Sequence, residues 1–193
     1  LQSDNATSLS IINTMYPILT TAGMKATLYV QSNVIGVANK LTLANLQTLY
    51  GAGWDLGNHT NGHENLTTAT IADAQTTVET CESFLRNNGF SRGLGHIAYP
   101  EGATNDTVNA MLSGIGFKTG RKATDKPQIV PMADPYKLEA YTLKAADSLA
   151  TMKSYVDAAI NGGKTSIIMI EGLADSSPAA QEILTSDYQA LVD

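Results

Sequence analysis

Apolar residues along the chain recur at two different spacings, which predicts helices and strands in turn. From Ser8 to Leu19 they recur every three or four positions, as on one face of a helix, and Gly23 ends the pattern. The run from Lys25 to Val30 is compact and β-prone, as is typical of a buried parallel strand. A helix followed by a short buried strand is therefore the first expected unit of the fold.

The same two patterns continue to the end of the chain. Helices are predicted over residues 43–50, 71–88, 105–114, 146–160 and 178–192, strands over 54–57, 97–99 and 165–170, and an irregular proline-containing stretch over 125–137. The alternation repeats at intervals of about 25 residues, the signature of βα units around a parallel sheet or barrel. Because no repeat or linker interrupts it, we predict one α/β domain spanning residues 1–193.

Composition narrows the classes of function. The 193 residues carry a formal net charge of -6, and 16% of them are charged. Nucleic acids and anionic membrane surfaces require basic patches, so neither is an expected partner, and a neutral or weakly polar substrate fits better. The longest apolar run, around residues 166–170, is far too short to insert across a bilayer. The abrupt start at Leu1 favours a piece cut from a longer chain.

Two of the three histidines, His59 and His63, lie four residues apart in the segment GNHTNGH, residues 57–63. One helical turn at that spacing would bring both rings onto one face. Neutral imidazole is a common zinc ligand, so the pair would be half of a tetrahedral site that needs a carboxylate. On spacing alone, two surface histidines in a polar loop are the slightly better explanation, because this spacing also arises by chance.

The other candidate residues share the placement of this pair, because each follows a predicted strand. Asp4 lies near the start of the chain, Glu101 stands in a Pro-Glu-Gly turn after residues 97–99, and Glu171 follows residues 165–170. In a βα barrel the C-terminal ends of the strands build the active site. This common placement favours a functional site over a chance pattern.

In this order, the segments resemble the polysaccharide deacetylases of the NodB-like group, carbohydrate esterase family four. The family's second motif, His-Ser/Thr-x-x-His, stands here as residues 59–63, between GWDLGN and ENLT. Residues 16–30 match the family's first helix and second strand, and residues 98–117 match its third motif and the helix after it. Asp-Pro-Tyr at 134–136 and the final strand at 167–172 complete the match. The resemblance covers essentially the whole chain and implies a distorted (β/α)7-type barrel.

The resemblance also implies the chemistry. A divalent metal, with zinc expected, would be held by Asp4, His59 and His63, and would lower the pKa of a bound water from about 16 toward about 7. An aspartate would act as base, a histidine as acid, and a backbone N–H of the third motif would help hold the oxyanion. The implied partner is an acetylated polysaccharide or oligosaccharide.

Four residues are candidates to contact that sugar. Pro100 and Gly102 belong to the third motif, while Tyr99 and Tyr136 could stack on sugar rings. Packing in the core with a satisfied hydroxyl group explains either tyrosine at least as well.

Both proton-transfer positions differ from the family's pattern. The first motif has two adjacent acidic residues, a base followed by a metal ligand, whereas here the pair is Ser3-Asp4. The arginine that would orient the base is also missing, because Ala98 or Tyr99 stands in its place. The absence of the acidic base and the absence of the arginine are consistent with each other, because a buried arginine without a carboxylate partner is costly. Glu171 replaces the expected catalytic histidine of the last strand.

Three functions follow from these departures. In the first, the domain removes N- or O-linked acetyl groups, and Glu171, or Glu101 as the second candidate, takes over proton transfer. General acid–base catalysis is typically worth ~10²–10⁴ in rate, so its alteration would impair an acetyl ester less than an amide. In the second, a catalytically silent glycan-binding domain keeps the metal and the groove. The third is a structural βα domain without metal.

The intact ligand set favours the enzyme, although a metal can also be retained for stability. The low charge and the surface rich in Thr and Asn suit an extracellular or surface-associated protein, such as a secreted enzyme, a cell-wall protein or part of a viral tail. The sequence leaves the identity of the sugar and the oligomeric state open.

Overall fold

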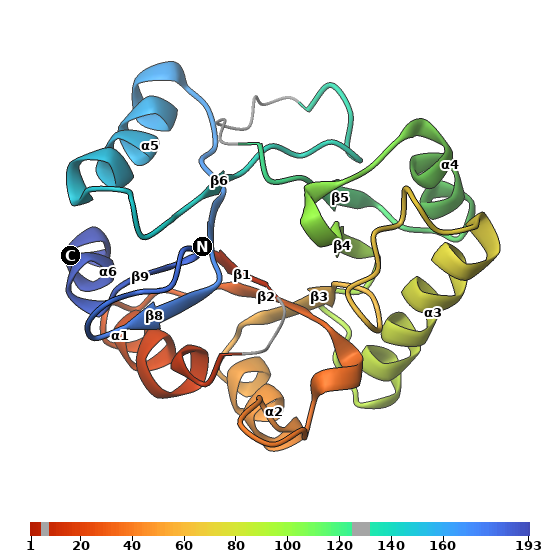
Figure 1. Cartoon of the computed structure of the whole chain (residues 1–193), viewed down its shortest axis with the longest axis horizontal. Coiled ribbons are helices and arrows are strands. Elements are labelled where there is room, and N and C mark those ends of the chain that lie inside the picture. The colour runs from red at the N-terminus through yellow and green to blue at the C-terminus, as the bar shows by residue number, and fades with distance from the viewer. Residues whose placement is uncertain (5–7, 125–131) are drawn as a thin grey trace.

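The computed structural model describes residues 1–4, 8–124 and 132–193. Its main sheet is curled and parallel, with the strand order β5-β4-β3-β2-β1-β7-β6, and helices surround it (Figure 1). The strands are β1 (Gln2–Ser3), β2 (Thr27–Val30), β3 (Asp55–Asn58), β4 (His96–Ala98), β5 (Thr119–Arg121), β6 (Tyr141–Thr142) and β7 (Ile168–Ile170). This architecture confirms the predicted distorted βα barrel.

Residues 138–142 link the two edges of the curled sheet. The Leu138 amide donates to the Gly120 carbonyl at 2.9 Å, and the Lys122 amide donates to the Leu138 carbonyl at 2.8 Å, both beside β5. A few residues later, β6 pairs in parallel with β7. Backbone hydrogen bonds therefore continue from β5 to β7, which gives the sheet its barrel-like curvature.

Each predicted helix is present at least in part, with shifted ends. They are α1 (Tyr16–Thr21), α2 (Leu43–Gly51), α3 (Ile71–Asn87), α4 (Asp106–Gly114), α5 (Leu149–Gly162) and α6 (Thr185–Val192), with a π-helical turn, η1 (Ile11–Met15), directly before α1 and two 3-10 turns, η2 (Ser32–Val34) and η3 (Pro100–Gly102). Side chains of Thr42, Thr70, Asn105 and Ser148 each accept a bond from the amide three residues later. These bonds satisfy amide groups that a helix start leaves unpaired, which explains why α5 begins after Ser148 and not at residue 146.

Apolar side chains between sheet and helices form the core. One cluster includes Leu28 of β2, Leu56 of β3 and Ile170 of β7, and Trp54 is buried in it. A second cluster lies under α3 and α4 and includes Val78. Each fully buried side chain of this kind contributes about 1.5–3 kcal/mol. The core therefore holds the strands rigidly, and with them the residues at the strand ends.

The predicted helix over residues 178–192 is wrong in its first half. Residues Glu182–Leu184 form strand β9, which pairs in parallel with β8 (Gly172–Ala174), and only α6 is helical. Ile183 is buried in the core, and a β-branched side chain packs well on a sheet. Pairing with β8 satisfies the backbone groups that a helix would have paired internally. Within the described ranges, no helix has the length and apolar character needed to cross a membrane.

Candidate active site

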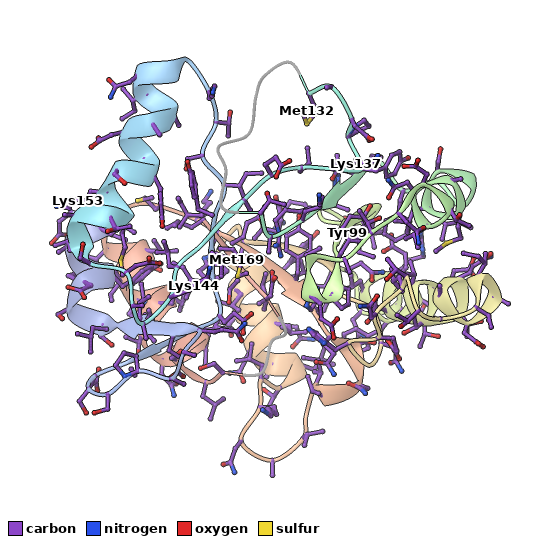
Figure 2. All side chains as sticks on the ribbon, turned by 45° about the horizontal axis from the view of Figure 1, so that its top comes forward. Tyr99, Met132, Lys137, Lys144, Lys153 and Met169 are labelled. Carbon is purple, nitrogen blue, oxygen red and sulfur yellow. The ribbon has the colours of Figure 1, made fainter. Side chains whose placement is uncertain are left out.

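A cavity of about 210 Å³ opens at the C-terminal ends of the barrel strands. Its walls include Asp4 after β1, His59 after β3, Arg121 at the end of β5 and Glu171 after β7. This is the end of a βα barrel at which active sites are built. Figure 2 labels three further lining residues, Tyr99, Lys144 and Met169, near the middle of the molecule.

A loop, and not a helical turn, brings the two histidines together. Thr60 and His63 have φ values of 64° and 65°, in the left-handed region. The Thr60 hydroxyl accepts a bond from the His63 amide at 2.9 Å, the local turn bond that is common for threonine. The ring centroids of His59 and His63 lie 5.0 Å apart. The predicted helical geometry is therefore wrong, because β3 leads into a tight turn, while the predicted pairing of the rings is confirmed.

His59 is held in the form that binds metals. Its Nδ1 lies 2.7 Å from the carbonyl oxygen of Ala98, and a carbonyl only accepts, so Nδ1 carries the proton and Nε2 keeps its lone pair. Burial lowers the pKa of His59 to about 4, so the ring is neutral at neutral pH. In metal sites, the ring nitrogen that does not bind the metal commonly donates such a hydrogen bond, which orients the histidine.

Asp4 makes an ion pair that the sequence did not reveal. Arg121 Nη2 donates to Asp4 Oδ2, and the two side chains are only 1% and 5% exposed. The guanidinium carbon lies 5.5 Å from the centroid of the Tyr29 ring, and Nη1 donates to the Lys122 carbonyl at 3.3 Å. The arginine that the third motif lacks is thus not the only one that could reach the site. Arg121 comes from β5 and not from the third motif.

The donor set fits a divalent metal in its chemistry but is not gathered into one cluster. Asp4 Oδ1 is buried and has no hydrogen-bond partner in the described part of the chain, so it is available as a ligand. The same residues, however, contain no group of three His, Cys, Asp or Glu side chains close enough to hold a metal ion. The structure brings the two histidines together and leaves Asp4 in the same cavity, bonded to Arg121.

Glu171 is a carboxyl group suited to exchanging protons. Burial raises its pKa to about 7, the charge of Asp4 adds to the increase, and Arg121 opposes it. A group whose pKa lies near the working pH is an efficient general acid or base. Glu101, the second candidate, lines the same cavity but is exposed, and its Oε2 accepts a bond from Asn65 at 2.7 Å.

Of the four residues predicted to contact the sugar, two line the cavity and two do not. Tyr99 and Gly102 line the cavity, but Tyr99 is only 1% exposed and its hydroxyl lies within hydrogen-bond distance of two acceptors, Asn109 Oδ1 and the Tyr136 carbonyl. The Tyr136 hydroxyl donates to the Phe117 carbonyl at 2.6 Å. Packing with satisfied hydroxyl groups, the alternative expected for both tyrosines, is what the structure shows.

Two other candidates lie outside the lining of the cavity, as does Tyr136. Ser3 is fully buried within β1, and its hydroxyl has no hydrogen-bond partner among the described residues. Pro100 is buried at the start of η3. Gly102, which does line the cavity, has a φ of 66°, and a Cβ there would lie 2.8 Å from the Ala123 amide nitrogen. A larger residue at position 102 would therefore be strained and would clash.

Sequence reasoning missed several lining residues, including Arg121, Lys144 and Gln181. Arg121 ends a strand, so the rule that identified Asp4 and Glu171 would have found it if residues 119–121 had been recognised as a strand. That strand contains Gly120 and is only three residues long, which hides its pattern. Gln181 was assigned to a helix that does not exist there.

Comparisons with known proteins identify the family and the fold. The family model described as polysaccharide deacetylase matches residues 4–120, more than half of the chain. The solved Streptococcus pyogenes deacetylase PplD, in complex with acetate, has a TM-score of 0.72 at 24% identity, covering 80% of this chain and 68% of that one. The family 4 carbohydrate esterase from Streptomyces lividans, in complex with acetate, has a TM-score of 0.59 at 14% identity, covering 99% and 81%.

A polysaccharide deacetylase from Bacillus cereus has a TM-score of 0.68 at 15% identity, and the match covers 79% of this chain. It covers only 49% of the Bacillus cereus protein, so the chain spans about half the length of that relative. No curated protein matches the sequence. At these identities the solved structures establish the fold, and the family model establishes the family.

Proposed function

We propose that this chain, which belongs to the polysaccharide deacetylase family, hydrolyses N- or O-linked acetyl groups on a polysaccharide with the help of a divalent metal. The observation that carries the proposal is the pair of adjacent imidazoles in the cavity, with His59 kept neutral by burial and oriented by Ala98. Neutral imidazoles held in this way are typical ligands of zinc, which is the metal we expect.

His59, His63 and Oδ1 of Asp4 would hold the metal. When bound, a divalent metal polarises the acetyl carbonyl and lowers the pKa of water. The protein's own contribution is to keep the imidazole of His59 unprotonated and to hold the two rings adjacent. Arg121 holds Oδ2 of Asp4 and leaves Oδ1 without a hydrogen-bond partner among the described residues.

Glu171 would move the protons. Its carboxylate takes a proton from the attacking water, and the resulting acid gives that proton to the leaving oxygen or nitrogen of the sugar, which releases acetate and the deacetylated unit. With a pKa of about 7, Glu171 is present in both forms near neutral pH. A sugar hydroxyl leaves more easily than an amine, so we propose that O-acetyl groups react faster. Glu101, at an exposed position of the cavity wall, is the second candidate.

One observation favours a glycan-binding domain without turnover as the second candidate. Asp4 is bonded to Arg121 and does not form a three-ligand group with the histidines in the described residues. A site that keeps this arrangement would bind glycans in its cavity but would not activate water. For either function we propose an extracellular or surface-associated setting, because that is where acetylated polysaccharides are exposed.

Acetate release separates the two candidates. The protein is incubated with N-acetylated and O-acetylated oligosaccharides, with added zinc and with a chelator, beside a His59→Ala variant. Release that needs both zinc and His59 is the expected result. A matched control is His96→Ala, because His96 contacts Thr119 and does not line the cavity. Zinc-loaded protein that releases no acetate from any substrate would support the binding domain instead.

A further inference from the structure

Side chains of α3 reach the turn that carries the two histidines through one buried asparagine. Asn58 is the last residue of β3, directly before this turn, and it is fully buried. Its Nδ2 donates to the Val78 carbonyl at 2.9 Å and to Glu82 Oε2 at 3.1 Å, both on α3. Its Oδ1 accepts a bond from the Thr60 amide at 2.9 Å. One side chain therefore connects the strand, the helix and the histidine turn.

Glu82 is held on both sides. Its Oε1 accepts a bond from the Gly95 amide at 2.8 Å, directly before β4, while its Oε2 accepts the bond from Asn58. Both oxygens of Glu82 and both polar atoms of Asn58 thus have partners. A polar network in which every member is satisfied is rigid. The position of Asn58 Oδ1 is therefore set by α3 and by the chain before β4, and not by the turn itself.

The turn is fixed along its whole main chain. Each of the five consecutive amides of residues 59–63 has an acceptor: in order, the Val30 carbonyl, Asn58 Oδ1, the carbonyl and hydroxyl of Thr77, Glu64 Oε2 and the Thr60 hydroxyl. Thr60 has a φ of 64°, which is unusual for a β-branched residue and persists only where the surrounding structure enforces it. Asn58 binds the amide of this strained residue, next to His59.

We infer that Asn58 is a positioning residue of the metal site, which acts through Thr60 to keep the two imidazole rings adjacent, and that Glu82 holds Asn58 in place. The inference rests on the proposed function, because it concerns the same two histidines. Helix α3 contributes no described residue to the lining of the cavity, so it acts on the site only through such bonds. Groups that orient metal ligands support a metal site almost as strongly as the ligands themselves.

Asn58→Ala tests this role in the full chain, with zinc affinity measured by competition against a chelator that changes colour. Removing a group that orients metal ligands typically lowers metal affinity about 10–100-fold, and this loss is expected here. Asn88→Ala is the matched control, because Asn88 also donates its side-chain amide to a carbonyl of α3, that of Phe84 at 2.8 Å. Asn88 caps the far end of α3, about three helical turns beyond Thr77, so zinc affinity should not change.

Hydrogen exchange of the metal-free protein reports on the turn directly. The Thr60 amide should exchange slowly in the parent protein and in Asn88→Ala, but rapidly in Asn58→Ala, where it has lost its acceptor. Amides of the core strands, measured in the same samples, report any general loss of stability. A selective change at Thr60 therefore separates positioning from folding.

A conservative exchange provides the rescue. Asn58→Asp keeps an acceptor for Thr60 but sets two carboxylates against each other across a contact of 3.1 Å. Adding Glu82→Gln supplies an amide that can donate across the same contact, and the net charge of the double variant equals that of the parent. Its zinc affinity and its slow exchange at Thr60 should return most of the way to the parent values.

Unchanged zinc affinity and unchanged Thr60 exchange in Asn58→Ala overturn the inference. So does an equal loss of zinc affinity in Asn88→Ala, or a double variant that is no better than Asn58→Ala. A parent protein that binds no zinc rejects the metal site of the proposed function. Exchange of the Thr60 amide, which needs no metal, then still decides whether Asn58 holds the turn.

Discussion

The two sides of the candidate active-site cavity are built in different ways. The histidine side comes mostly from one short segment: β3 and one tight turn place both rings, and a bond from His59 to Ala98 of β4 orients the first ring. The acidic side is assembled from three strands far apart in the sequence, with Asp4 after β1, Arg121 on β5 and Glu171 after β7. The first side depends on one short segment and on the hydrogen bonds that hold it, a single one of them to the neighbouring strand β4, and the second on charges whose positions are set by the whole barrel. The predictions below test this difference.

Removing a metal ligand should have the largest effect. His59→Ala is expected to lower kcat/KM by at least about 10⁴-fold, because a divalent metal both activates water and polarises the carbonyl. The measurement is acetate release together with the zinc content of the purified variant. Full zinc occupancy and normal activity in this variant would show that the histidine side has another role.

Glu171→Gln should have the next largest effect. Glutamine keeps the shape of the side chain but cannot exchange a proton, so kcat is expected to fall by ~10²–10⁴. The loss should be greater for an N-acetyl than for an O-acetyl substrate, since the amine needs protonation to leave. Glu101→Gln is the matched control and should lower kcat much less. Equal losses in both variants would remove Glu171 from its assigned role.

Breaking the Asp4–Arg121 pair should affect stability. Arg121→Met leaves a buried carboxylate without its partner, which costs about 3–5 kcal/mol in the free energy of unfolding. Combining it with Asp4→Asn should restore part of the loss, because no unpaired charge then remains. Urea unfolding measures both variants. A single variant within about 1 kcal/mol of the parent protein would be inconsistent with a buried pair of this kind.

The smallest effect is a change in how stability depends on pH, measured without metal. Burial lowers the pKa of His59 from 6.5 to about 4, so its contribution to stability is lost as the pH falls through this range. Burial raises the pKa of Glu171 from 4.5 to about 7, so its contribution is lost as the pH rises through that range. Between pH 4.5 and 6.5 the two effects oppose each other.

Removing one of these two groups reveals how the other changes stability with pH. Glu171→Gln should therefore lose stability on acidification from pH 6.5 to 4.5 more steeply than the parent protein, with Glu101→Gln again as the control. The free energy of unfolding at several pH values provides the measurement. Identical slopes in Glu171→Gln and the parent would contradict the assigned burial of His59 or Glu171.

The difference between the two sides of the cavity explains what the sequence could and could not predict. The barrel follows from periodic apolar residues, and the histidine pair from a short motif whose residues remain neighbours in space. Arg121 could not be paired with Asp4, because a distance of 117 positions in the sequence carries no local signal. Strand β9 was mistaken for helix, since a short apolar run is compatible with both until β8 is there to pair with it.

The most direct test of the account is X-ray absorption at the zinc edge, on protein loaded with zinc and on its Asp4→Asn variant. We predict one zinc ion bound by two imidazole nitrogens and by oxygen atoms, with weaker binding in the variant. Protein that binds no zinc, or binds it without imidazole, would contradict the assignment of the histidine pair. Unchanged zinc binding in Asp4→Asn would remove Asp4 from the ligands.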